Sequence, residues 1–148
     1  MEFKSINQLK SLIDENKISV KEIAQTYIKN IKEKKDLNIF IYFDEDKINN
    51  QVKEIEKLPN NKKLKGIPIA VKDLFCTKNM PTTAASKILE NFNPTYESFV
   101  TQKLINEGSL FVGKTNLDEF AMGSATNTSY FGNTINPLSN HDTPLAPG

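Results

Sequence analysis

Two short apolar runs separated by a helical pattern most constrain the fold of this 148-residue chain. Residues 67–71 read IPIAV and residues 110–112 read LFV. Neither run alternates with polar residues, which is typical of strands covered on both faces. Apolar residues within 99–105 predict a helix between the two strands, and Gly108 can end that helix. Because a strand–helix–strand order favours a parallel crossover, the sequence predicts an α/β fold.

Two amphipathic helices are predicted near the N-terminus. Ser5 and Ser19 each precede apolar residues at helical spacing, and a side-chain oxygen at such a position can cap a helix. Ser19 and Glu22 also have the spacing of a capping box. We therefore expect helices over residues 5–15 and residues 19–34.

The pattern changes after the second helix. Residues 38–43 (NIFIYF) are rich in isoleucine and aromatic residues, which is typical of a strand or an extended segment. Asp44 can cap a third helix, which ends before the polar loop at Pro59. We interpret the chain as a helical region over residues 1–63, followed by part of an α/β domain over residues 64–148.

A lysine ends the first apolar run. Lys72 follows Val71, and a lysine at the end of a buried strand loses part of its hydration. This loss favours the neutral amine, which can carry protons near neutral pH. The alternative is structural, because a lysine at a strand end usually reaches solvent or pairs with a neighbour, here Asp73.

Composition excludes several kinds of site. The basic residues are all lysine, and 19 of them against 18 acidic residues predict no basic surface for nucleic acid. Without arginine, the chain has no bidentate fork for a carboxylate or phosphate. One cysteine, Cys76, and one histidine, His141, predict neither a disulfide nor a metal cluster, and His141 is expected in a solvated loop. No membrane span is expected, and we expect the cytoplasm or the soluble interior of an organelle.

Residues 113–148 are rich in Gly, Ser, Thr, Asn and Pro, and a long segment of this kind usually builds a site or a partner contact. It starts with GKT at Gly113, which lacks the glycine spacing of a phosphate-binding loop. Asp118 and Glu119 suggest a metal or acid pair, but adjacent side chains diverge in a regular element, so helix capping or a surface role is expected. Because this segment ends without a closing helix, we expect the chain to be the N-terminal fragment of a longer protein.

Several motifs resemble the amidase-signature family. They are LKGIPIAVKD at residues 64–73, TTAASKIL at residues 82–89, GKTNLDEFAMGS at residues 113–124 and APG at residues 146–148. The segments DEFAMGS, SKILENF and FGNTINP are most similar to the tRNA-dependent amidotransferases within that family. The resemblance covers nearly the whole chain, weakly over the first 60 residues and strongly from residue 64.

The resemblance implies a mixed, mostly parallel sheet flanked by helices, incomplete in this chain, and amide hydrolysis by a Ser–cis-Ser–Lys triad without a metal. Lys72 matches the catalytic lysine, whose neutral amine draws a proton through one serine hydroxyl from another. Both serines would follow Gly148, so the chain is expected to be inactive on its own. Met122, Gly123 and Ser124 match a loop that lines the substrate pocket. The alternative is that Gly123 permits a turn while Met122 packs in the core.

The same resemblance implies a reaction and partners. In such amidotransferases, ammonia from glutamine passes to a partner subunit that converts ATP-activated Glu-tRNA(Gln) into Gln-tRNA(Gln). The implied partners are subunits B and C of a heterotrimer. ATP and Mg are used by the partner subunit, no cofactor is expected in this chain, and tRNA is expected to contact the complex rather than this segment. Two alternatives stay open: a free-standing amidase acting on another carboxamide, and a non-catalytic truncated product that binds a partner.

Overall fold

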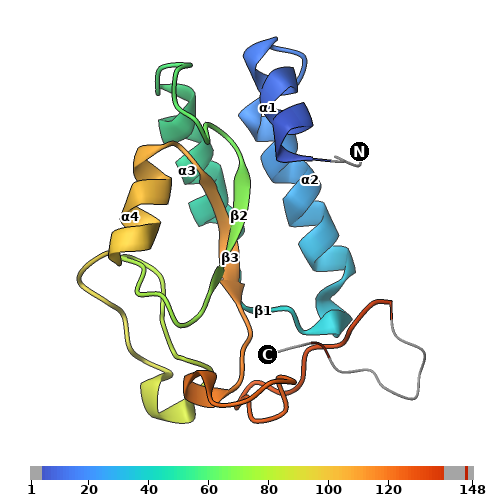
Figure 1. The fold of residues 1–148 in the computed structure, drawn as a ribbon, viewed down its shortest axis with the longest axis vertical. Coiled ribbons are helices and arrows are strands. Elements are labelled where there is room, and N and C mark those ends of the chain that lie inside the picture. The colour runs from blue at the N-terminus through green and yellow to red at the C-terminus, as the bar shows by residue number, and fades with distance from the viewer. Residues whose placement is uncertain (1–4, 139–145, 147–148) are drawn as a thin grey trace.

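Helices lie on both sides of a short sheet in the computed structural model, which describes residues 5–138 and residue 146 (Figure 1). The α-helices are α1 (Ile6–Asp14), α2 (Val20–Glu33), α3 (Glu45–Glu56) and α4 (Phe99–Asn106), the strands are β1 (Phe40–Tyr42), β2 (Pro68–Lys72) and β3 (Leu110–Thr115), and three short 3-10 helices are η1 (Lys35–Leu37), η2 (Lys87–Leu89) and η3 (Glu119–Ala121). The predicted α/β fold is confirmed.

Local capping explains where the N-terminal helices begin. The Ser5 side chain accepts a hydrogen bond from the Gln8 backbone at the start of α1. At the start of α2, Ser19 and Glu22 form the predicted capping box, with the Glu22 carboxylate accepting from the Ser19 backbone at 2.9 Å. At the start of α3, the Asp44 side chain accepts a hydrogen bond from the Lys47 backbone at 2.9 Å. These contacts satisfy donors that a helix start leaves free, and they confirm the predicted helix starts.

The sheet places β3 between the other two strands, in the order β1-β3-β2. β2 runs parallel to β3, as the strand–helix–strand order predicts, and β1 runs antiparallel to it. Val71 pairs with Lys114, and Lys72 pairs with Thr115. β1 thus joins the N-terminal helical region to the same sheet. The division at residue 63 stays a prediction.

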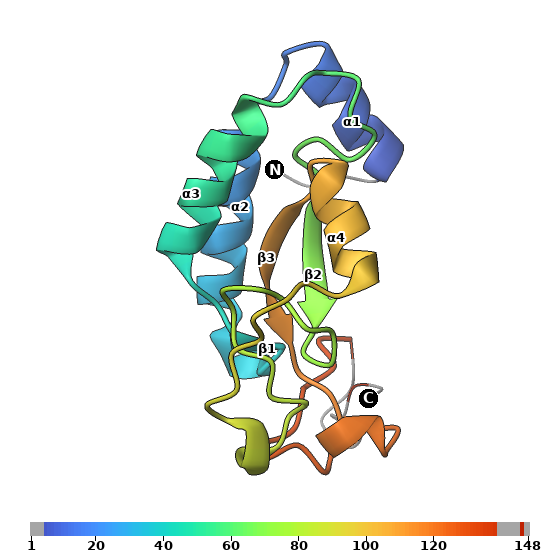
Figure 2. The same cartoon turned by 90° about the vertical axis from the view of Figure 1, so that its left-hand side faces the viewer.

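The core lies mainly between α2, α3 and β3. Its largest cluster of buried side chains comprises Val20, Ala24, Ile28, Ile48, Val52, Ile55, Leu110 and Val112. α2 and α4 lie on opposite sides of the strands in both views (Figure 1, Figure 2). The amphipathic faces predicted for the N-terminal helices therefore pack on the core of this chain.

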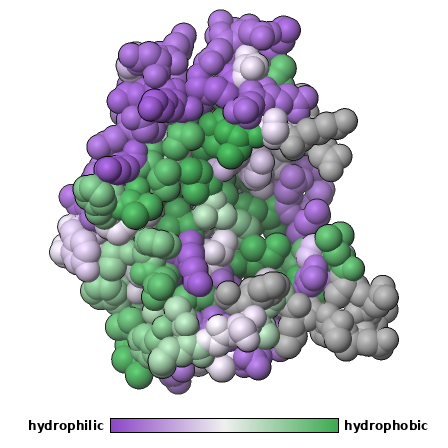
Figure 3. Space-filling model, in the orientation of Figure 1, coloured by the Kyte–Doolittle hydropathy of each residue, from purple (hydrophilic) through white to green (hydrophobic). Residues whose placement is uncertain are grey.

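β2 differs from the expectation of a strand covered on both faces. Val71 is buried, but Ala70 is exposed, because α2 does not close over this face of β2 and leaves a groove there. The groove has a volume of about 720 Å³ and is lined mainly by apolar residues of α2, the β1 region and the sheet, together with Asn30, Lys32, Lys34 and Lys35. Figure 3 shows this apolar surface over the middle of the molecule. Complete burial of β2 was therefore the wrong prediction for the described structure.

The segments that follow β2 and β3 lie together beyond the carboxyl ends of these strands, at the bottom of Figure 1. In open α/β sheets this edge is where ligands commonly bind. Within residues 5–138, no helix is both long and apolar enough to cross a membrane.

Candidate active site

Lys72 is the last residue of β2 and is half-buried. Its main chain is held on two sides: the Phe75 N–H donates to the Lys72 carbonyl at 3.0 Å, and the next residue, Asp73, donates its N–H to the Thr115 carbonyl at 3.0 Å. No ion pair joins Lys72 to Asp73 in the described chain, so that part of the structural alternative is wrong, while the part in which Lys72 reaches solvent stays open. Asp73 instead pairs with Lys114 across the sheet, at 3.1 Å.

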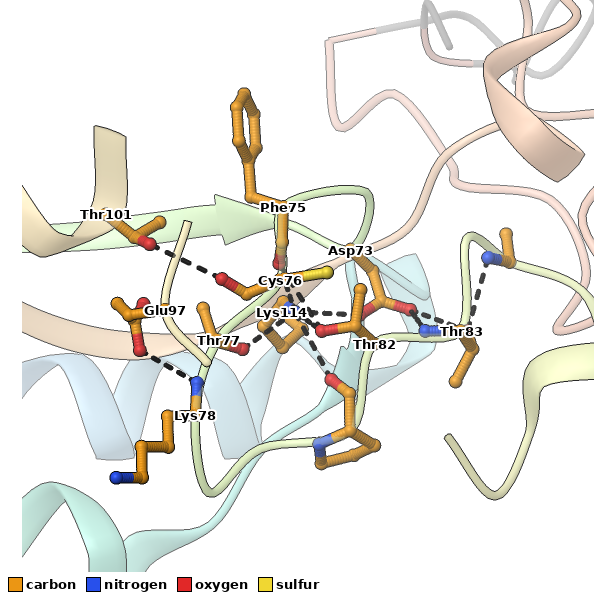
Figure 4. Close-up of polar contacts among 12 residues, drawn as sticks. Asp73, Phe75, Cys76, Thr77, Lys78, Thr82, Thr83, Glu97, Thr101 and Lys114 are labelled. Atoms are coloured by element: carbon orange, nitrogen blue, oxygen red, sulfur yellow. Dashed lines mark hydrogen bonds and ion pairs between the residues drawn. The ribbon is translucent and has the colours of Figure 1, made fainter. Parts of the chain in front are cut away.

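The ammonium of Lys114 is fully buried below the loop that follows Lys72, and the residue is 0% exposed (Figure 4). Lys114 lies on β3 directly opposite Val71, and its Nζ reaches into the loop that follows β2. Five oxygens surround Nζ: Phe75 O at 2.9 Å, Thr77 Oγ1 at 2.9 Å, Pro81 O at 3.2 Å, Thr82 Oγ1 at 2.7 Å and Asp73 Oδ1 at 3.1 Å.

Burial and the nearby negative charge act in opposite directions on the pKa of the Lys114 ammonium. Burial lowers the pKa of Lys114 below its ordinary value, because the charged form loses hydration, and the nearby Asp73 carboxylate partly opposes that change. The contact with Asp73 Oδ1 is an ion pair without the geometry of a directed hydrogen bond. The cluster therefore depends on the four uncharged oxygens as well as on the carboxylate.

The second oxygen of Asp73 orders the TTAAS segment at residues 82–86. Oδ2 accepts from the Thr83 backbone N–H at 2.8 Å and from the Thr83 hydroxyl at 2.5 Å, while the Ala84 N–H donates to the Asp73 carbonyl at 2.9 Å. Ala84 and Ala85 both have positive φ, at 50° and 55°. Such strain in residues with a side chain concentrates at functional sites.

This strained turn contacts the loop that follows β3. The Phe120 N–H donates to the Ala84 carbonyl at 2.9 Å, and the Tyr130 N–H donates to the Ala85 carbonyl at 2.9 Å. The Ser86 hydroxyl donates to Glu119 Oε1 at 2.6 Å. The loop after β2 and the loop after β3 therefore form one layer at the carboxyl end of the sheet.

Asp118 organises the loop after β3 from inside. It is 1% exposed, so the expected surface or capping role is wrong: its carboxylate bonds the turn that follows. It accepts hydrogen bonds from the backbones of Ala125, Thr126 and Thr128 and from the Thr128 hydroxyl. Burial by itself would raise the pKa of Asp118, but these hydrogen bonds outweigh burial and the pKa is lowered.

The predicted substrate-binding residues Met122, Gly123 and Ser124 lie on the outside of this loop. All three are exposed, and Met122 is 74% exposed, which rules out the alternative in which it packs in the core. Gly123 lies against the buried carboxylate: a Cβ at this position would fall 2.4 Å from Asp118 Cγ. Close approach to Asp118, rather than an unusual φ, explains why glycine fits there.

The structure thus joins Lys72 through the loop after β2 to the loop that carries Met122, Gly123 and Ser124. Their catalytic and substrate-binding roles stay predictions.

Sequence reasoning missed Lys114, although one signal was present: a lysine only two positions after a buried apolar run still lies within the same strand. His141, Pro147 and Gly148 lie outside the described residues. Within the described part of the chain, no group of three or more His, Cys, Asp or Glu could hold a metal ion.

Comparisons with known proteins agree on one family. An amidase family model matches residues 22–145. The A subunit of the glutamyl-tRNA(Gln) amidotransferase of Pelagibacter ubique is 47% identical over 145 residues, which is 97% of this chain and 29% of that protein. The solved A subunit of the same enzyme from Thermotoga maritima is 36% identical, with a TM-score of 0.62 over 82% of this chain and 27% of that one. A solved structure described as an amidase is 25% identical, with a TM-score of 0.83 over 97% of this chain and 33% of that one.

The chain therefore spans only about a third of the length of these relatives, or less. The family match covers most of the chain, and the α/β architecture agrees with the solved amidase structures. The chain belongs to the amidase family.

Proposed function

We propose that the protein containing this chain is the glutamine-hydrolysing subunit of a tRNA-dependent amidotransferase, which supplies ammonia for the conversion of Glu-tRNA(Gln) to Gln-tRNA(Gln). The observation that carries this proposal is the 47% identity, over 97% of the chain, to a relative named as the A subunit of glutamyl-tRNA(Gln) amidotransferase. Subunits B and C are the proposed partners. ATP and Mg would be bound by the partner subunit rather than by this chain.

Lys72 is the proposed proton relay. Its neutral amine would accept the proton of a serine nucleophile through a second serine, and the proton would later leave with the ammonia. The position of Lys72 at the carboxyl end of a parallel strand, half-buried and with its main chain held by Phe75, supports this role. Met122, Gly123 and Ser124 are the proposed substrate-binding residues, and their exposure leaves them accessible to a bound amide.

A free-standing amidase acting on another carboxamide is the second candidate. Its support is the fold likeness to a solved amidase, with a TM-score of 0.83 at 25% identity, whereas the amidotransferase of Thermotoga maritima has a TM-score of 0.62 at 36% identity. The two candidates share the same chemistry at Lys72 and differ in substrate and partners.

The test is an ammonia-release assay on the full-length protein with glutamine, aliphatic amides and aryl amides, combined with a pull-down of candidate B and C subunits. The proposal predicts hydrolysis of glutamine and copurification with both partners. Turnover of other amides without glutamine hydrolysis, by a protein that purifies without partners, would favour the free-standing amidase.

A further inference from the structure

The Lys114–Asp73 pair is fully buried, and the proposed reaction uses neither side chain. A buried ion pair adds little stability, because removing both charges from water offsets most of their attraction. Stability therefore does not explain well why Lys114 carries a charge at this buried position. The oxygens around the ammonium suggest a different role for it.

Four of the five oxygens around Lys114 Nζ belong to one short segment, residues 75–82, which follows Lys72. Two of the four are the main-chain carbonyls of Phe75 and Pro81, near the two ends of that segment. Lys114 itself belongs to the central strand β3. The ammonium therefore ties both ends of the segment to the central strand of the sheet (Figure 4).

The same contacts reach the main chain of Lys72. Phe75 accepts from the ammonium through its carbonyl at 2.9 Å and donates its N–H to the Lys72 carbonyl at 3.0 Å. Val71 pairs with Lys114 and Lys72 pairs with Thr115, so alternation along the strands puts the Lys72 side chain on the opposite face from Lys114. Lys114 can thus influence Lys72 through the backbone and not by direct contact of the two amines.

We propose that Lys114 is a positioning residue for Lys72: its buried ammonium holds residues 73–82 against β3 and so fixes the main chain that carries the catalytic amine. This inference rests on the proposed role of Lys72. A lysine suits the position because an ammonium offers three donors that can serve several carbonyl and hydroxyl oxygens at once. An apolar side chain of similar length, such as that of methionine, would leave the carbonyls of Phe75 and Pro81 without this donor.

The test compares variants of the full-length protein. Lys114→Met combined with Asp73→Asn removes both buried charges together, which avoids the cost of leaving one unpaired. Thr77→Val is the milder variant, because it removes one oxygen around the ammonium and keeps the side-chain shape. Thr101→Val is the matched control: Thr101 is also buried and also contacts the segment, through the Cys76 carbonyl, but it does not contact the ammonium.

We expect the double variant to lose about 10-fold or more in kcat, because small misplacements of a catalytic group are costly. The KM for glutamine should stay within about twofold, since the loss falls on the chemical step and not on binding. Thr77→Val should shift kcat in the same direction by a smaller factor, and Thr101→Val should leave kcat unchanged. Hydrogen exchange of a peptide covering residues 73–82 should be faster in the double variant and in Thr77→Val.

A folded double variant with wild-type kcat, or with unchanged exchange over residues 73–82, would overturn the inference. If the double variant does not fold, Thr77→Val decides: wild-type kcat and exchange in that variant would overturn it equally. Failure of the proposed function has a different signature, namely wild-type protein without glutamine hydrolysis or an active Lys72→Ala variant. The exchange measurement still tests Lys114 in that case.

Discussion

At the scale of single residues, buried polar groups shape the loops beyond the sheet. Asp118 is buried and accepts four hydrogen bonds from residues 125–128. These hydrogen bonds order a loop that has no regular secondary structure at those residues. Thr126, one of the donors, has a φ of 56°. A carboxylate that accepts several backbone hydrogen bonds can hold such a conformation, because its charged form is favoured there.

Asp118 should make the stability of the protein depend on pH. Its pKa in the folded protein is lowered from 3.8, so its contribution is complete above that value and is lost as the pH falls through the lower folded pKa. We expect Asp118→Asn to reduce the free energy of unfolding at pH 7, and the difference from wild type to shrink below about pH 4. Urea unfolding across this pH range measures both effects.

Asp36→Asn is the control for this measurement, since Asp36 is exposed. It should change the free energy of unfolding by less than about 0.5 kcal/mol. A difference between Asp118→Asn and wild type that grows as the pH falls would contradict the assignment.

At the scale of elements, a side chain of helix α3 makes the hydrogen bonds that a neighbouring strand would make with the start of β3. β1 pairs with Lys114 and Thr115 of β3, and among the described residues no strand lies beside the start of β3 on that side. Gln51 of α3 bonds there instead: the Phe111 N–H donates to its side-chain oxygen at 3.0 Å, and its amide nitrogen donates to the Phe111 carbonyl at 3.0 Å. One amide side chain thus satisfies both main-chain groups of a buried residue.

Gln51→Leu should therefore destabilise the protein by about 1–3 kcal/mol, because both polar groups of Phe111 lose their partner. Gln25→Leu is the matched control. Gln25 likewise joins two elements, in this case α2 and α3 through Asn49, but at an exposed site where the loss should stay within about 0.5 kcal/mol. Equal losses for the two variants in urea unfolding would show that Gln51 does not hold β3.

The helices and the parallel strand pair were predictable, because their signals are local. Ser5, Ser19 and Asp44 each cap a helix through a residue three positions away, so the short-range pattern contains the interaction. The surroundings of Lys114 were not predictable in this way, since Thr77 lies 37 positions from it in sequence. The prediction for Asp118 was wrong for a related reason. It assumed that the side chains of Asp118 and Glu119 diverge as neighbours do in a helix or strand, but the loop that contains Asp118 is irregular.

At the scale of the whole molecule, two grooves lie on different sides of the described chain. One, of about 720 Å³, lies between α2 and the sheet, and the other, of about 840 Å³, lies between α3 and α4. The loops after β2 and β3 lie away from both helix layers, at the carboxyl ends of the strands (Figure 2). The helices thus supply the core, while the candidate active site is built from these loops and the end of β2.

The central claim is that Lys72 carries the proton for amide hydrolysis. The most direct measurement is ammonia release from glutamine by the full-length protein, with Lys72→Ala compared to wild type and to Lys53→Ala, whose lysine is exposed on α3. We expect Lys72→Ala to lose activity by about a thousandfold or more and Lys53→Ala to keep it. Wild-type ammonia release by a folded Lys72→Ala variant would show that Lys72 does not carry the proton.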